Sequence, residues 1–186
     1  MAVREIIRMG HPTLRTPARP LTDAEIASAE IRDLVDDMVD TLHAAGGIGL
    51  AAPQIDVPVR LAIIEIVDAE EGSSRYGDIP AMPLTVFVNP EIEVVDPASA
   101  GFWEGCLSVP GLRGFVERPQ HVRVRARDLA NRPLHLELRG FLATVFQHEF
   151  DHLDGRLYID RMTDPTRLMF EAEFERFVLD GEALTD

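Results

Sequence analysis

Five consecutive residues, His148 to His152, carry the strongest chemical signal in this sequence of 186 residues. In a helix, His148 and His152 lie one turn apart on the same face, where two imidazole rings can bind one divalent cation. Glu149 then lies beside the metal without binding it, where its carboxylate can take a proton from water. The alternative is a surface helix that carries charged and histidine side chains. The pattern predicts a metal site with an adjacent general base.

A catalytic metal site usually has a third protein ligand and leaves one position for water. The candidate is Cys106, in the segment Glu104–Ser108. A thiolate is a good ligand for zinc or ferrous iron, and Gly105 before it permits close approach of the backbone. A lone cysteine is, however, more often a small buried hydrophobic residue. The residue types alone leave both interpretations open.

The elements expected around these residues are typical of an α+β fold. Apolar residues at helical spacing indicate a helix that ends before Gly46-Gly47, and alternation of polar and apolar residues indicates a hairpin around Asn131-Arg132-Pro133. One helix, several antiparallel strands and two further helices fit the α+β class. We expect helices at 29–44, 141–153 and 165–178, strands at 59–66, 84–88, 91–95, 121–127 and 134–138, and loops at 10–22 and 68–83.

Length and composition favour one globular domain over residues 1–186, with a C-terminal helix and acidic tail over about 165–186. Hydrophobic residues make up 46% of the chain and charged residues 27%, as in ordered globular proteins. A net charge of −14 argues against binding to nucleic acids or anionic membranes. No apolar run reaches membrane-spanning length. Because Cys106 is the only cysteine, no intramolecular disulfide can form, and the cytoplasm is the expected compartment.

Three segments together resemble the signatures of the peptide deformylase family. They are Gly47–Gln54 (GIGLAAPQ), Glu104–Ser108 (EGCLS) and His148–His152 (HEFDH). Taken alone, the first is no more than a glycine-rich helix stop, since it lacks the end of a phosphate-binding loop. The three occur in the family's order and at similar spacing, and the similarity extends from the Pro-x-Leu-Arg segment at Pro12 to about residue 160. Three signatures in order are far more specific than one.

The resemblance implies a fold in which strands surround a central helix that bears the two histidines. It also implies one divalent metal ion bound by Cys106, His148 and His152, with Glu149 as the acid/base residue. Ferrous iron is the usual metal in the family, and zinc, nickel or cobalt can also occupy the site. The general affinity order of divalent metals does not select among them.

The resemblance further implies a hydrolase that removes the N-formyl group from the N-terminal methionine of newly made bacterial or organellar polypeptides, releasing formate. Glu149 would accept a proton from the attacking water and deliver one to the leaving amine. The backbone N–H of Leu107 and the side-chain amide of Gln54 would stabilise the charge on the formyl oxygen. The partners implied are formylmethionyl peptides and nascent chains.

Several residues are expected to contact this peptide. Phe141, Thr144 and Val145 share the helix face of the metal ligands and would wall a methionine pocket, although ordinary core packing is the alternative. The family binds the peptide backbone as an added strand. The glycine-rich and cysteine segments would lie against that backbone through Gly47, Ile48, Gly49 and Gly105.

Two charged residues near the signatures have simpler expected roles. Asp151 points away from the metal face of a regular helix, so we assign it a structural role, with a salt bridge to Arg118 by analogy. Arg113 either faces the peptide entrance or lies in solvent.

Two alternatives remain on the sequence alone. One is a zinc peptidase of the His-Glu-x-x-His kind with Glu171, Glu173 or Glu175 as third ligand, which leaves Cys106 unexplained. The other is a non-catalytic protein with a structural metal, although such a site would normally close with a fourth protein ligand.

Some family members dock on the ribosome through a basic C-terminal helix. Docking is doubtful here because acidic residues dominate the tail, namely Glu171, Glu173, Glu175, Asp180, Glu182 and Asp186.

Overall fold

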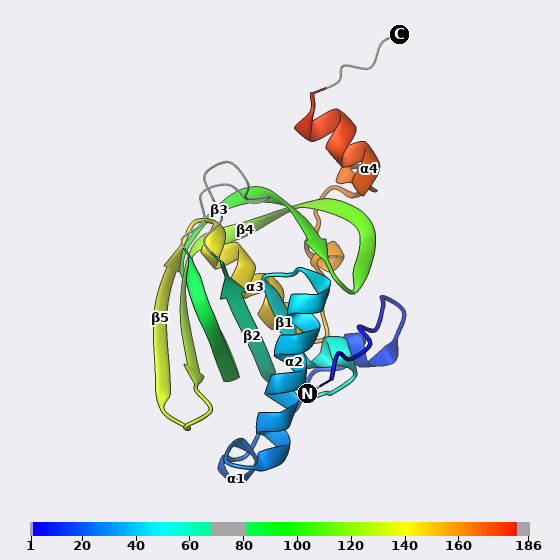
Figure 1. Cartoon of the computed structure of the whole chain (residues 1–186). Coiled ribbons are helices and arrows are strands. Elements are labelled where there is room, and N and C mark those ends of the chain that lie inside the picture. The colour runs from blue at the N-terminus through cyan, green and yellow to red at the C-terminus, as the bar shows by residue number, and fades with distance from the viewer. Residues whose placement is uncertain (1, 68–80, 182–186) are drawn as a thin grey trace.

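A six-stranded antiparallel sheet organises the computed structural model, which describes residues 2–67 and 81–181 (Figure 1). The longer helices are α2 and α3, and most of the remaining helical segments are single turns. The α-helices are α1 (Asp23–Ile26), α2 (Ala29–Ala45), α3 (Phe141–Leu153) and α4 (Glu171–Phe174), and η5 (Glu175–Leu179) is a π-helix. The 3₁₀ turns are η1 (Pro12–Arg15), η2 (Ala52–Ile55), η3 (Tyr158–Arg161) and η4 (Pro165–Arg167). The strands are β1 (Gly49–Ala51), β2 (Leu61–Ile66), β3 (Met82–Cys106), β4 (Val109–Arg127), β5 (Pro133–Arg139) and β6 (Leu168–Phe170).

The strands follow the order β1-β2-β3-β4-β5, and β6 pairs with β4. β3 and β4 form one long hairpin that curves over the top of the molecule in Figure 1 and closes where Cys106 pairs with Val109. The expected strands 84–88 and 91–95 are therefore parts of a single strand. Asn89-Pro90 and Asp96-Pro97 resemble turns in the sequence, but the register shifts of the β3–β4 ladder fall there, so these residues bend the strand without ending it.

Each face of the sheet is covered by one helix. Side chains alternate between the two faces of a strand, so Leu61 and Ile63 of β2 belong to the same core as α2. Ala62 and Ile64 belong to the core that contains α3. Because both faces are covered, β2 is apolar at nearly every position, and the strand expected at 59–66 is confirmed as β2.

Both long helices have local start and stop signals that match the sequence. The side chain of Ser28 accepts a hydrogen bond from the N–H of Ile31 (3.2 Å) and caps α2, and Gly46 ends it in the left-handed region (φ 65°). α3 ends at Leu153, shortly before Gly155 (φ 70°). The helices expected at 29–44 and 141–153 are confirmed, as is the hairpin of β4 and β5.

The helix expected over 165–178 is wrong in its first half. The chain instead makes the turn η4 and the short strand β6, whose residues pair with Leu112–Gly114 of β4, and becomes helical only at Glu171. Pairing with β4 outweighs a local helical pattern, because propensity is a weak guide where tertiary contacts compete. The expected loop at 10–22 contains one 3₁₀ turn (η1). Most of the expected loop at 68–83 lies outside the described residues.

Candidate metal centre and active site

Cys106, His148 and His152 come together beneath the β3–β4 hairpin. The sulfur and the imidazole nitrogens lie within 4.8 Å of one another, and Cys106 Sγ is 3.3 Å from His152 Nε2. The helix α3 supplies the two histidines one turn apart, with ring centroids 5.2 Å apart. The last residue of β3 supplies the thiol. This is the donor set and spacing that a tetrahedral catalytic metal ion uses, with one position left for water.

Glu104 fixes the orientation of His148. Its Oε2 lies 2.7 Å from His148 Nδ1. A carboxylate can only accept a hydrogen bond, so Nδ1 donates its proton to Glu104 and Nε2 is the nitrogen that faces the cluster. On the other side, the ring of Tyr158 is stacked with His148 at a centroid distance of 6.0 Å. A carboxylate–histidine contact of this kind is the usual support for a metal-binding imidazole.

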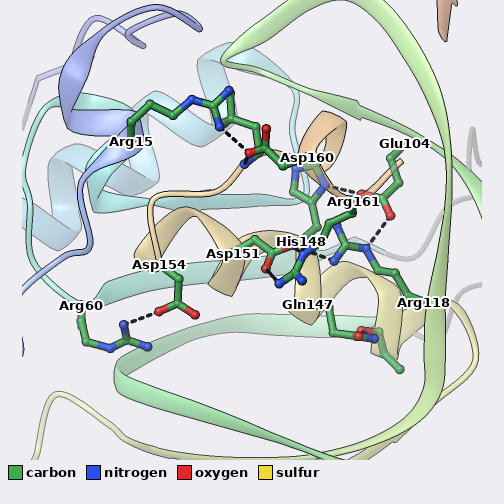
Figure 2. A network of polar contacts seen from close by, with 12 residues as sticks. Arg15, Arg60, Glu104, Arg118, Gln147, His148, Asp151, Asp154, Asp160 and Arg161 are labelled. Atoms are coloured by element: carbon green, nitrogen blue, oxygen red, sulfur yellow. Dashed lines mark hydrogen bonds and ion pairs between the residues drawn. The ribbon is translucent and has the colours of Figure 1, made fainter. Parts of the chain in front are cut away.

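A buried network of charges supports this contact in turn (Figure 2). Arg118 donates two hydrogen bonds to Glu104 (2.6 and 3.1 Å) and one to Asp151 (2.8 Å). Arg161 also donates to Asp151 (3.1 and 2.5 Å). The expected salt bridge of Asp151 and Arg118 is confirmed, and it joins the helix of the histidines to the strand β4.

Replacing Arg118 by methionine is expected to lower the free energy of unfolding by about 3–5 kcal/mol, because Glu104 and Asp151 would remain buried without their cation. Urea denaturation measures this. The matched control is Arg125→Met on the same strand, whose pair with Glu93 is solvent-exposed and should contribute at most about 1 kcal/mol. Equal effects of the two substitutions would show that the network around Arg118 is not what stabilises this region.

The local charges make the thiol acidic and favour positive charge on the histidine. Burial alone raises the pKa of the Cys106 thiol, but the charge of His152 and hydrogen bonds from both imidazoles lower it to about 5. Burial lowers the pKa of His148, but contacts with Cys106 and Glu104 outweigh it and raise that pKa well above its usual value. Burial raises the pKa of Glu104, yet its bonds to His148 and Arg118 leave the pKa lowered. The pocket therefore stabilises a cation beside a thiolate, which fits a divalent metal ion.

Glu149 lies next to this cluster and is 6% exposed. Within residues 2–67 and 81–181, its Oε2 is buried without a hydrogen-bond partner. Burial raises the pKa of this carboxyl above its usual range. A buried carboxylate with a spare acceptor atom, beside a metal site but outside its ligand set, is suited to hold or move a proton.

The N-terminal arm, the segment that contains Ile7 and Met9, holds Gln54 next to the turn that follows Cys106. Gln54 Oε1 accepts the N–H of Ala51 (2.8 Å), so Nε2 points to Ser108 Oγ (3.3 Å) and Cys106 Sγ (3.6 Å). The amide of Ile7 donates to the carbonyl of Gln54 (2.9 Å), and Met9 donates to that of Ser108 (2.8 Å). The arm thus joins two residues that are 54 positions apart in the chain, and the Gln54 side chain presents a fixed N–H donor at the site.

A pocket of about 250 Å³ opens over the cluster. One side is the glycine-rich segment, the other is the turn after β3, and His148 and Glu149 line its floor. Arg113 and Glu171 also line the pocket. The expected peptide-contacting residues Gly47, Ile48, Gly49 and Gly105 all line this pocket, together with Gln54, Cys106 and Leu107.

Gly49 is the residue whose lack of a side chain matters most here. A Cβ at this position would lie 2.5 Å from the carboxyl carbon of Glu149. We expect Gly49→Ala to displace that carboxylate and to lower the rate of any reaction in which Glu149 moves a proton by about 100-fold, because small misplacements of a reacting group have effects of this size. The metal content should stay normal. A variant with wild-type kcat would show that the position of Glu149 is not critical.

A second, smaller cavity of about 50 Å³ adjoins the first. Phe141, Thr144 and Val145 line it, as expected, with His148 and Glu149 at its inner end. They do so in addition to packing in the core, since Thr144 and Val145 are 1% and 5% exposed. Their place in a methionine pocket stays a prediction, and the structure shows that they both line a cavity and pack in the core.

Sequence reasoning missed several residues of the site. Trp103 lines the smaller cavity, and Tyr158 stacks on His148. Arg113 was left between pocket and solvent; it is 7% exposed and lines the larger pocket, so the solvent alternative is wrong. In the sequence these residues are marked only by their positions near the motifs. Such positions do not reveal which side chains meet across the sheet.

Comparison with known proteins shows the family to which the chain belongs. The sequence model described as "Polypeptide deformylase" matches residues 3–168. This chain belongs to the polypeptide deformylase family. A relative in Leptospira biflexa named peptide deformylase is 45% identical over 163 residues, covering 87% of this chain and 89% of that one. The match of the family model ends at residue 168.

Solved deformylase structures share the fold. The Met-Ala-Ser-bound class I type b peptide deformylase of Acinetobacter baumannii has a TM-score of 0.80 at 36% identity, covering 86% of this chain and 98% of that chain. A peptide deformylase of Synechococcus elongatus, solved with actinonin, has a TM-score of 0.74 at 34% identity, covering 97% and 87%. The α+β fold expected from the sequence is confirmed.

Membership of the deformylase family argues against both alternatives. Deformylases are metal-dependent hydrolases that remove the formyl group from N-formylmethionine of new proteins. In the described part of the chain, the metal-competent cluster contains Cys106 and neither Glu171, Glu173 nor Glu175, so the peptidase ligand set is not formed. The cluster has three members beside an open pocket, unlike a closed structural site.

None of the helices among residues 2–67 and 81–181 has the length and apolar character needed to cross a membrane.

Proposed function

We propose that this protein uses one divalent metal ion, bound by Cys106, His148 and His152, to hydrolyse the formyl group from formylmethionyl peptides. The observation that carries the proposal is the convergence of these three donors within 4.8 Å, with Glu149 beside them on the floor of an open pocket. When bound, the metal supplies the Lewis acidity that lowers the pKa of water and polarises a carbonyl.

Glu149 is the proposed acid/base residue. Its raised pKa brings it nearer to neutrality, where a carboxyl both accepts and releases protons readily. It takes the proton of the attacking water and passes one to the amine that leaves as the formyl C–N bond breaks. The products are then formate and a free N-terminal methionine.

Gln54 and Leu107 are the proposed donors to the formyl oxygen as negative charge builds on it. Gln54 suits this role because its Oε1 is occupied by Ala51, which fixes Nε2 toward the site before substrate arrives. Leu107 lines the pocket directly after Cys106. A fully metal-loaded Gln54→Ala variant with wild-type kcat would remove Gln54 from this role.

The methionine side chain is proposed to enter the smaller cavity, and the peptide backbone to run along β1. The structure pairs β1 with β2 on one edge, and β1 stands at the end of the strand order. Its other edge lies at the larger pocket, where an extended peptide can add as a strand. The walls of the cavity are Phe141, Thr144, Val145, Ile48 and Trp103.

We infer that the metal in the cell is ferrous iron, because ferrous iron is the usual metal of the family. Zinc, nickel or cobalt can substitute for it. The cytoplasm is the proposed compartment, because the lone cysteine supports a reducing environment. The proposed substrates include chains that emerge from the ribosome. The acidic C-terminal residues argue against docking on ribosomal RNA, so we propose that access does not depend on this tail.

The test is formate release from formyl-Met-Ala-Ser. The iron-loaded protein should release formate, the protein stripped with a chelator should not, and addition of ferrous iron or cobalt should restore the activity. Formate release that persists in full after complete metal removal would contradict a metal-dependent mechanism. Absence of release from the fully loaded protein would contradict the proposed activity itself.

A further inference from the structure

The C-terminal segment after residue 164 is anchored beside the pocket. β6 pairs antiparallel with residues 112–114 of β4. Phe174 of α4 packs against Trp103 with ring centroids 5.2 Å apart, and the guanidinium of Arg167 lies 3.2 Å from the ring centre of Phe115. Figure 1 shows α4 starting at the curved end of the β3–β4 hairpin. The start of α4 therefore has a fixed place in the pocket wall.

This anchoring brings a carboxylate into the pocket wall. Glu171, the first residue of α4, lines the pocket, and its Oε1 is 2.7 Å from Arg113 Nη2. The Arg113 side chain is 8% exposed and that of Glu171 is 31% exposed. A Cβ at Gly105 would collide with the guanidinium of Arg113, so this group lies flat against the backbone next to Cys106. The ion pair thus forms the part of the pocket wall next to Gly105.

The pair determines which charge a bound peptide meets. Arg113 alone would attract acidic groups, but Glu171 compensates its charge in an ion pair. The more exposed member of the pair is the carboxylate, in a protein whose net charge is −14. Like charges brought together at an interface reduce affinity, and opposite charges increase it and direct orientation. A peptide side chain that reaches this end therefore meets negative charge.

We propose that Glu171 sets the charge preference for the residues that follow formylmethionine, favouring basic and disfavouring acidic side chains. This inference rests on the proposed function. An extended peptide advances about 3.3 Å per residue, so the preference is tested at each of the first two residues after methionine. Glu171 lies beyond residues 3–168, the part of the chain that the family model matches.

The experiment compares kcat/KM for formate release from formyl-Met-Ala-Lys, formyl-Met-Ala-Ser and formyl-Met-Ala-Asp, all as C-terminal amides. A second set of peptides carries lysine, serine or aspartate directly after formylmethionine. The wild type should prefer lysine to aspartate, and Glu171→Gln should reduce this ratio about fivefold, the upper end for a partly exposed charge pair. The change should appear in KM and not in kcat, because it alters binding and not the reacting groups.

The matched control is Glu173→Gln, the same change of charge on an exposed residue of the same helix. It should leave the lysine-to-aspartate ratio as in the wild type. The wild-type ratio should also fall toward one as ionic strength rises, because the charges are partly exposed.

Three outcomes would overturn the inference. One is normal turnover of the serine peptide with an unchanged ratio in Glu171→Gln, which leaves the proposed function intact. Another is an equal change in Glu173→Gln, which would mean that the total charge and not this contact acts on the peptide. The third is the absence of formate from the serine peptide with every form of the protein, which would overturn the proposed function and this inference together.

Discussion

Glu149→Gln is expected to lower kcat for deformylation by about 100- to 10,000-fold, the range for loss of a general acid/base. Glutamine has nearly the same shape but cannot take up a proton at neutral pH. Because Glu149 is outside the cluster of Cys106, His148 and His152, the variant should bind metal as the wild type does. Steady-state kinetics and the metal content after dialysis measure the two effects.

The control is Glu117→Gln, the same chemical change on an exposed residue of β4. It should keep wild-type kcat. If Glu149→Gln retained activity within tenfold of the wild type, another group would have to move the proton. Loss of metal from Glu149→Gln would instead make Glu149 a ligand, contrary to the geometry.

Cys106→Ser should remove the metal and, with it, almost all activity. The thiolate is available because the pKa of the thiol is lowered to about 5, whereas a serine hydroxyl stays protonated. Loss of a residue that only supports a ligand already lowers metal affinity about 10- to 100-fold, so loss of a ligand should exceed 100-fold. Titration with a competing chelator measures the affinity.

Glu171→Gln is the comparison that separates deformylase from peptidase chemistry. It should keep wild-type metal affinity and full activity on a peptide without charged side chains. The reverse pattern, with metal retained by Cys106→Ser and lost by Glu171→Gln, would support the peptidase ligand set. The distance from Glu171 to Arg113 (2.7 Å) already gives this carboxylate a different partner.

The parts of the fold that local patterns specify could be predicted from the sequence. α2 and α3 have apolar residues at helical spacing and glycine stops, and the hairpin of β4 and β5 alternates clearly. The histidine pair followed directly from spacing within α3. These features depend on contacts between residues that are close in the chain, which is why they are visible in it.

Contacts between distant residues could not be predicted in this way. The role of Cys106 as a ligand came from the resemblance, since a lone cysteine gives no spacing to interpret. The support of His148 by Glu104 depends on the pairing of β3 with the rest of the sheet. β6 was mistaken for helix because its pairing with β4 is a tertiary contact. The roles assigned to Gln54 and Leu107, and the single domain over 1–186, remain predictions.

The most direct measurement is the identity of both products when the iron-loaded protein acts on formyl-Met-Ala-Ser, read by mass spectrometry. We predict formate and intact Met-Ala-Ser in equal amounts, because the metal-binding cluster and Glu149 act on the formyl C–N bond. Recovery of formyl-Met together with Ala-Ser would show cleavage of the peptide bond instead. That result would contradict the account of this site.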